Sequence, residues 1–182
     1  MKYHIANTIA RHDAGEPLKY LFFWGHQPSK DGSITQSCFS QWWEQPFEAE
    51  GLQYRTAEHW MMAGKARLFN DEEMLAKILE AKSPAQAKKF GREVQNFDQA
   101  AWESARYDIV VQGNLHKFGQ HDGLKDFLLR TGDKILVEAS PFDRIWGIGL
   151  AKTSPNIESP HTWKGLNLLG FALMKVRDML NV

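Results

Sequence analysis

The sequence predicts an α+β fold: a compact, mainly helical single domain with a small sheet. Helical periodicity recurs along most of the chain after residue 55, whereas strand-like runs are few and do not alternate regularly with helices. The length of 182 residues suits one domain of ordinary size. No linker or internal repeat divides the sequence, so we expect a single domain over residues 1–182, with its core at about 20–180.

Strands are expected where short apolar runs meet turn residues. The segments 20–24 and 134–140 are apolar runs of strand length, and 35–43 alternates loosely enough to be a candidate further strand. Between the strands at 20–24 and 35–43, the segment PSKDGS at 28–33 has the residue composition of a turn. The segment 141–162 is rich in Gly, Pro and Ser and is expected to be a loop.

Helices are predicted where capping residues precede apolar residues at helical spacing. Thr56 and Asp98 are good N-caps, Pro84 suits a first turn, and Gly132 suits a helix end. The expected helices cover 56–69, 71–81, 83–92, 99–118, 121–132 and 164–180. The core face of the first is expected to hold Ala57, Met61, Gly64 and Leu68.

Composition excludes several classes of protein. Lys and Arg total 22, as do Asp and Glu, so bulk positive charge for binding nucleic acid is absent. The single cysteine, Cys38, makes neither an intramolecular disulfide nor a multi-cysteine zinc site. The N-terminus lacks the apolar run of a signal peptide, and no stretch approaches the roughly 20 apolar residues of a membrane helix. We therefore expect a cytoplasmic protein that does not bind membranes.

Glu58 and Lys65 are the first candidates for catalytic residues. A separation of seven residues is nearly two helical turns, so both side chains point the same way with Cα atoms roughly 10 Å apart. Glu58 falls in the first turn, where the helix dipole favours an anion. The alternative is a solvated charged face, which spacing alone favours.

Arginines and a glycine-containing loop supply candidate binding groups. Arg106 falls on the inner face of the 99–118 helix, where it needs a structural ion pair or a ligand phosphate. Arg92 follows a glycine at a helix end and is less constrained. In FDRIWGIG, at 142–149, Gly147 allows close approach to a ligand and Asp143 could accept hydrogen bonds from ribose hydroxyls, although the loop alone is a weak signal.

Metal and cofactor motifs are absent from the sequence. Neither an HExxH zinc motif nor a Walker-type or dinucleotide-binding glycine pattern occurs. His59, His116, His121 and His161 show no ligand spacing and are interpreted as surface or structural residues. We therefore expect no metal and no cofactor.

Together these segments resemble the YbiA-like, or NADAR, family. The run from Thr56 through Glu58 and His59 to Lys65 resembles its TxEHxxxxxK helix. Further likenesses follow in order: FFWG at 22–25, GR at 91–92, WxxxR at 102–106, LLxTG at 128–132, DxxWGxG at 143–149 and GxNxLG at 165–170. FFWG and the segment 150–165 depart from the bacterial pattern, which leaves substrate choice the least determined feature.

The resemblance implies a compact α+β fold and an N-glycosidase that acts on a phosphorylated ribosyl small molecule, such as an early riboflavin-pathway intermediate. It implies that Lys65 attacks the anomeric carbon as a Schiff base and that Glu58 is its acid/base partner. Expected substrate contacts are Trp24, Arg92, Arg106, Asp143, Trp146 and Gly147. Direct hydrolysis, with Glu58 placing water and Lys65 binding phosphate, is the competing mechanism.

Two other functions remain open from the sequence. One is removal of ADP-ribose from guanine in DNA or RNA, which the neutral net charge disfavours. The other is a non-catalytic module that binds ADP-ribose or a nucleotide, which the presence of both Glu58 and Lys65 argues against.

Overall fold

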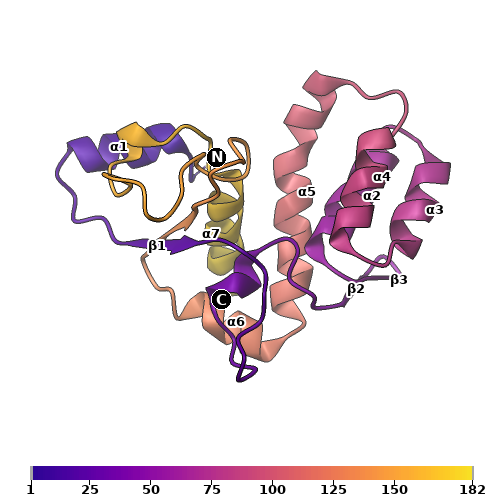
Figure 1. The fold of residues 1–182 in the computed structure, drawn as a ribbon, viewed down its shortest axis with the longest axis horizontal. Helices are drawn as coiled ribbons and strands as arrows, with labels where there is room; N and C mark the ends of the chain where they lie inside the picture. Colours follow the sequence, from indigo (N-terminus) through magenta and orange to yellow (C-terminus); the bar gives the residue numbers. More distant parts are fainter. Residues whose placement is uncertain (1, 182) are drawn as a thin grey trace. The chain divides into compact units, whose positions relative to one another are not determined.

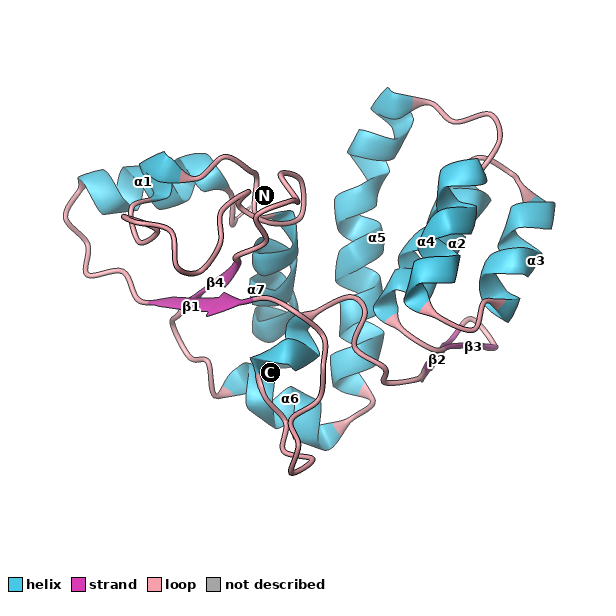
Figure 2. Ribbon diagram, in the orientation of Figure 1, coloured by secondary structure: helices cyan, strands magenta, loops and turns pink. Residues whose placement is uncertain are grey.

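The computed structural model describes residues 2–181, which divide into two compact units (Figure 1). The first unit combines the two ends of the chain, up to Ser40 and from Gly123 onward, and the second unit is the continuous segment Gln41–Asp122. Helices make up most of the second unit, whereas the first unit contains long loops, and the strands are short in both (Figure 2). The predicted α+β class with little sheet is confirmed.

The second unit is a group of helices with a small hairpin at one end. Helix α2 contacts α3, α4 and α5, so it forms the centre of this unit. The hairpin pairs β2 with β3 in antiparallel register, from Phe47 opposite Tyr54 to Ala49 opposite Leu52. The elements are β2 (Phe47–Ala49), β3 (Leu52–Tyr54), α2 (Ala57–Leu68), α3 (Glu72–Glu80), α4 (Pro84–Glu93) and α5 (Gln99–Gly119).

The first unit is built around two parallel strands covered by a helix. Strand β1 pairs with β4, from Tyr20 opposite Ile135 to Phe23 opposite Glu138, and α7 packs on β4. Residues 135–137 of β4 are buried, which explains their continuous apolar run. The elements are α1 (Ile5–Asp13), β1 (Tyr20–Phe23), the 3-10 helix η1 (Gln36–Phe39), α6 (Asp122–Leu129), β4 (Ile135–Glu138), the 3-10 helix η2 (Pro160–Thr162) and α7 (Leu168–Leu180).

Local capping explains where the helices of the second unit begin. The Thr56 side chain accepts a hydrogen bond from the His59 main-chain N–H, and Asp98 accepts one from Ala101, as the sequence predicted. Asp71 and Ser83 cap α3 and α4 in the same way. Each cap satisfies a donor that the first helical turn leaves unpaired.

Several expectations for local structure were wrong. Segment 35–43 contains the 3-10 helix η1 in place of a strand, because the Cys38 N–H bonds back to the Thr35 carbonyl. Helix α1 and the β2–β3 hairpin were not predicted. Leu68 is 37% exposed and therefore lies outside the core face of α2.

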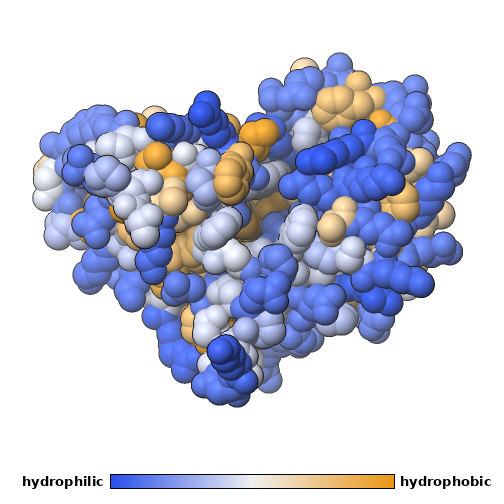
Figure 3. Space-filling model, viewed as in Figure 1, coloured by the Kyte–Doolittle hydropathy of each residue, from blue (hydrophilic) through white to orange (hydrophobic). Residues whose placement is uncertain are grey.

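The surface visible in the space-filling view is mostly hydrophilic, with scattered apolar residues (Figure 3). Among residues 2–181, no helix combines the length and the apolar character that a membrane span requires.

Candidate active site

Lys65 lies in a partly desolvated position among three segments of the second unit. Its Nζ atom donates a 2.7 Å hydrogen bond to the Gly91 carbonyl oxygen on α4. The same atom lies 4.3 Å from the ring centroid of Phe97 and 5.8 Å from that of Trp102. Burial lowers the pKa of Lys65 below its ordinary value of 10.5. The fraction of neutral, nucleophilic amine at neutral pH is correspondingly increased.

Glu58 is buried, with only 3% of its surface exposed. A solvated charged face, the alternative that spacing favoured, is therefore excluded for this residue. The first turn of α2 is held by Gln41, whose carbonyl accepts the Glu58 N–H at 3.0 Å. The Gln41 side chain in turn accepts a 2.8 Å hydrogen bond from Asn114 on α5. This buried amide pair fixes the start of the helix that carries Glu58.

Gln41 and Asn114 were missed by the sequence reasoning, as were the roles of Phe97 and Trp102 beside Lys65. Gln41 and Asn114 are 73 positions apart, so no local pattern connects them. Trp102 gave a partial signal, because it lies four positions before Arg106, which was expected on the inner face of the 99–118 helix.

Arg106 is buried on α5, as its helical face predicted, and is 7% exposed. Its Nη1 atom lies 3.8 Å from the Glu103 carboxylate, which is half exposed. Its Nε atom is buried without a hydrogen-bond partner among residues 2–181. A guanidinium with one long ion pair and one unsatisfied donor retains capacity for an anionic ligand.

Glycines allow the helices of this unit to approach closely. A Cβ atom at Gly91 would clash with Met62 Sδ, and one at Gly113 would clash with the Trp60 ring. The Trp60 indole N–H donates a 2.8 Å hydrogen bond to the Ile109 carbonyl on α5. The glycines therefore set the distances that α2, which carries Glu58 and Lys65, keeps from α4 and α5.

Arg92 is exposed near the end of α4, directly after the Gly91 carbonyl that binds Lys65. Of the predicted residues, the second unit thus holds Glu58, Lys65, Arg92 and Arg106. It places the first two on one helix and the arginines on the two helices that pack against it.

The remaining predicted residues belong to the first unit and follow its parallel strands. Trp24 comes directly after β1 and is 59% exposed. Asp143, Trp146 and Gly147 lie in the loop after β4. Because β1 and β4 are parallel and in register, Trp24 and this loop leave the same edge of the strand pair. Ligands commonly bind outside the carboxyl ends of parallel strands.

The loop after β4 is held by its own side chains. Asp143 Oδ1 accepts hydrogen bonds from the main-chain N–H groups of Ile145, at 2.8 Å, and Trp146, at 2.7 Å. A Cβ atom at Gly147 would lie 2.8 Å from the Glu138 carbonyl oxygen, so only glycine fits beside β4. Asp143 and Gly147 therefore shape the loop, whereas Trp146 is half-buried and Trp24 is exposed.

Comparison with known proteins extends these observations. Residues 22–181 match the family model of the NADAR domain. An N-glycosidase of Acanthamoeba polyphaga mimivirus is 43% identical over 169 residues, covering 90% of this chain and 97% of its own length. N-glycosidase YbiA of Escherichia coli is 32% identical over 146 residues, covering 80% and 81%. The NMR structure of Escherichia coli YbiA superposes with a TM-score of 0.71 at 29% identity, covering 90% of this chain and 85% of that one.

Proposed function

Because the chain belongs to the NADAR domain family, we propose that it cleaves the ribose–nitrogen bond of a phosphorylated, nucleotide-like substrate. The N-glycosidase class rests on the curated relatives, which carry that name. The substrate and the roles of individual residues are proposed from the resemblance of the motifs and from the geometry of the second unit. Phosphorylated ribosylamines of early riboflavin synthesis are the substrates that the resemblance favours.

One observation carries the mechanism: the Lys65 amine is partly desolvated on the same helix as the buried Glu58. Desolvation favours the neutral amine, which is the nucleophilic form. A protonated Glu58 supplies the proton that opens the ribose ring of the substrate. Lys65 is therefore proposed as the nucleophile and Glu58 as the general acid.

The proposed covalent route balances as a hydrolysis. Glu58 protonates the ring oxygen, and the C1′–ring oxygen bond breaks to give an iminium between C1′ and the base nitrogen. Lys65 Nζ adds to C1′, and the bond to the base nitrogen then breaks while a proton moves to the base. Water adds to the resulting Schiff base at C1′, which releases Lys65 as the amine and the ribose phosphate as the aldehyde.

Arg106 is proposed to bind the phosphate of the substrate. Its buried Nε atom lacks a hydrogen-bond partner among the described residues, and its ion pair with Glu103 is long, at 3.8 Å. A guanidinium can donate two parallel hydrogen bonds to the oxygens of a phosphate. Arg92, which is exposed, is proposed as a second and weaker phosphate contact.

Trp24 and Trp146 are proposed to contact the base or sugar, because each offers ring surface that the core does not fully cover. Asp143 is proposed to accept a hydrogen bond from a ribose hydroxyl. Gly147 is proposed to act indirectly, because its close packing against β4 sets the shape of the loop that meets the substrate.

Borohydride trapping tests the covalent route. The wild-type protein is incubated with a ribosylamine phosphate and borohydride, and the peptide that gains the mass of the sugar is identified. Lys65→Arg keeps the charge but removes the nucleophile, and Lys89→Arg changes an exposed lysine on α4 as the matched control. We expect an adduct on Lys65 in the wild type and in the control, and no adduct or turnover in Lys65→Arg.

The other outcomes separate the mechanisms. Turnover by the wild type with no adduct would show direct hydrolysis through an oxocarbenium ion. Full turnover by Lys65→Arg would remove Lys65 from the chemistry altogether. A panel of riboflavin-pathway ribosylamines, ADP-ribosyl guanosine and ADP-ribosylated DNA, with released products identified by mass, assigns the substrate.

A further inference from the structure

The first unit brings together three side chains that commonly bind metal ions. His12 and Asp13 end helix α1, and His161 lies in η2, which packs against that helix. His161 Nε2 lies 2.6 Å from Asp13 Oδ1, and His12 Nδ1 lies 3.3 Å from the same oxygen. One donor atom from each of the three residues lies within 4.8 Å of the other two. We propose that His12, Asp13 and His161 form a binding site for Zn²⁺ or a similar divalent transition metal.

The spacing of the three donors suits a tetrahedral metal. Zinc-to-ligand distances near 2.0–2.1 Å place neighbouring ligands of a tetrahedron about 3.3 Å apart. The separation of 3.3 Å between His12 and Asp13 matches this value, whereas the hydrogen-bonded separation of 2.6 Å between His161 and Asp13 has to lengthen when an ion binds. The three side chains are between 40% and 54% exposed, so small rotations can adjust them around an ion.

The chemistry of the donors also fits. Two imidazoles and a carboxylate form a nitrogen and oxygen set that Zn²⁺ accepts, and three protein ligands leave a fourth position for water or another ligand. The ionised carboxylate and the neutral imidazole are the forms of these side chains that bind a metal ion.

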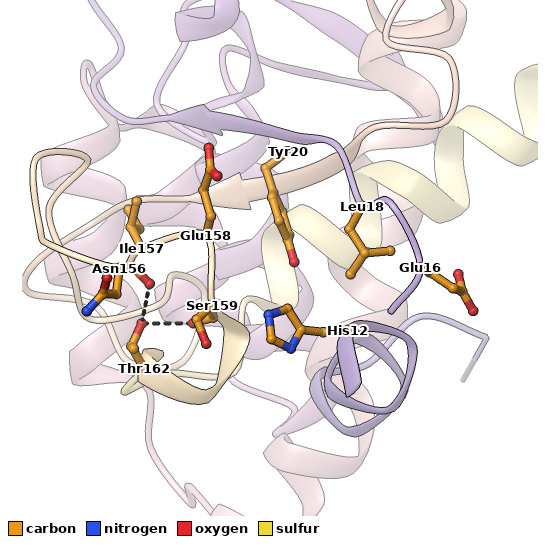
Figure 4. Close-up of a pocket in the computed structure, with 9 residues that line it drawn as sticks. All are labelled: His12, Glu16, Leu18, Tyr20, Asn156, Ile157, Glu158, Ser159 and Thr162. Carbon is orange, nitrogen blue, oxygen red and sulfur yellow. Dashed lines mark hydrogen bonds between the residues drawn. The ribbon is translucent and has the colours of Figure 1, made fainter. Parts of the chain in front are cut away.

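A pocket of about 680 Å³ borders this cluster (Figure 4). His12 lines the pocket from α1, and Ser159 and Thr162 line it from the facing segment. Glu16 and Glu158 also line it, and the Glu16 carboxylate is paired with Arg11 at 2.7 Å. The pocket gives the fourth coordination position room for a water molecule or a small ligand.

The Tyr20 hydroxyl supports a polar role for the pocket. It is buried without a hydrogen-bond partner among residues 2–181, although Tyr20 lines the cavity. Burial and the nearby Glu158 carboxylate raise the pKa of Tyr20, so the hydroxyl stays protonated and can donate to a bound water or ligand.

The proposed metal site does not depend on the N-glycosidase activity. Helix α1 lies outside residues 22–181, which match the family model, so His12 and Asp13 are features of this chain beyond that match. His161 lies within the matched residues, in the segment between β4 and α7. Metal binding is accordingly tested without an activity assay.

Co²⁺ is the probe, because its visible absorption bands report the geometry of its ligands. The chelator-treated protein is titrated with Co²⁺, the bound Co²⁺ is displaced with Zn²⁺, and Zn²⁺ binding is measured by calorimetry. The variants are His161→Ala, Asp13→Asn and His161→Gln, the last of which can still donate a hydrogen bond to Asp13. His26→Ala removes a histidine of the same unit outside the cluster and is the matched control.

We expect one metal ion per chain, with intense four-coordinate Co²⁺ bands, in the wild type and in His26→Ala. Loss of one ligand is expected to weaken binding at least about 10- to 100-fold, the loss seen even for residues that only support metal ligands. Retention of wild-type affinity in both His161 variants would overturn the proposal. A wild-type protein that binds neither ion would overturn it equally.

Discussion

Lys65 Nζ on α2 donates a 2.7 Å hydrogen bond to the main-chain carbonyl oxygen of Gly91 on α4. This contact exists because residue 91 has no side chain, since a Cβ atom there would clash with Met62 Sδ and lie 3.2 Å from Met62 Cβ. The separation of the two helices and the position of the amine are therefore set by the same residue.

Gly91→Ala is predicted to disturb both stability and chemistry. The added methyl group pushes Met62 or the whole of α4 away from α2, and overpacking of this kind costs about 1–3 kcal/mol. The displaced carbonyl no longer holds the Lys65 amine, so trapping on Lys65 should slow. Urea unfolding and borohydride trapping measure the two effects. Lys89→Ala, on an exposed position of α4, should leave both unchanged.

The pKa of Lys65 provides a second prediction. Burial lowers it below 10.5, whereas the hydrogen bond from Lys77 to Glu73 raises the pKa of Lys77. In an NMR titration of the lysine side chains, Lys65 should therefore lose its proton at a lower pH than Lys77. The rate of trapping should rise with pH as the neutral amine accumulates, over the range in which Glu58 keeps the proton that ring opening requires. A Lys65 that titrates at or above Lys77 would contradict this account.

Arg106 is predicted to act on substrate affinity more than on turnover. Hydrogen bonds to charged groups contribute about 1.5–3 kcal/mol, so Arg106→Gln should raise KM for a phosphorylated substrate roughly 10- to 100-fold. Inorganic phosphate should inhibit the wild type and have little effect on the variant. If Arg106 serves only as the partner of Glu103, the variant will lose stability while inhibition by phosphate stays the same.

Acid stability depends on His59, which is 1% exposed. Its two ring nitrogens bond to the Thr56 hydroxyl, at 2.8 Å, and the Ala81 carbonyl, at 3.0 Å. Burial lowers the pKa of His59 below its ordinary 6.5. The unfolded state then binds the proton more readily, so stability is lost as pH falls below 6.5, by up to about 1.4 kcal/mol per pH unit.

His59→Gln tests this dependence. The glutamine amide can still donate to the Ala81 carbonyl but does not titrate. The variant should be less stable than the wild type near neutral pH, because packing around it changes. Its loss of stability between pH 7 and pH 5, measured by urea unfolding, should be smaller than that of the wild type. Equal losses would assign the acid sensitivity to other groups.

Local signals predicted the helices of the second unit well. Thr56 and Asp98 cap their helices as expected, because a cap is a contact between residues two or three positions apart. Helix α1 was missed because its only buried residue is Thr8, and its stability depends on packing against η2. The prediction of a strand at 35–43 was wrong because hydrogen bonding near Thr35 favours a 3-10 turn over an extended strand.

The candidate site was predicted only in part. The spacing of Glu58 and Lys65 predicted a common direction for the two side chains, but the burial of Glu58 depends on how the second unit packs around α2. The cluster of Asp13 and His161 could not be found from spacing, because the two residues are 148 positions apart. Contacts of this range appear only once the chain is folded.

Asn167, within the GxNxLG motif, is predicted to serve the fold and not the chemistry. It is fully buried and adopts a left-handed conformation with φ of 54°. Its Oδ1 accepts from the Glu138 N–H at 2.9 Å, and its Nδ2 donates to the Leu136 carbonyl at 2.9 Å. The side chain therefore joins the start of α7 to the edge of β4 that lies opposite β1.

Asn167→Ala removes both buried hydrogen bonds. It also places alanine in a left-handed backbone conformation, which alanine adopts less readily than asparagine does. We expect a loss of about 2–4 kcal/mol in the free energy of unfolding. Asn167→Asp should also destabilise, because a carboxylate oxygen would face the Leu136 carbonyl without a proton to donate. Leu166→Ala, at an exposed neighbour, is the control and should cost little. A chain that keeps its stability in Asn167→Ala but loses turnover would instead place Asn167 in the chemistry.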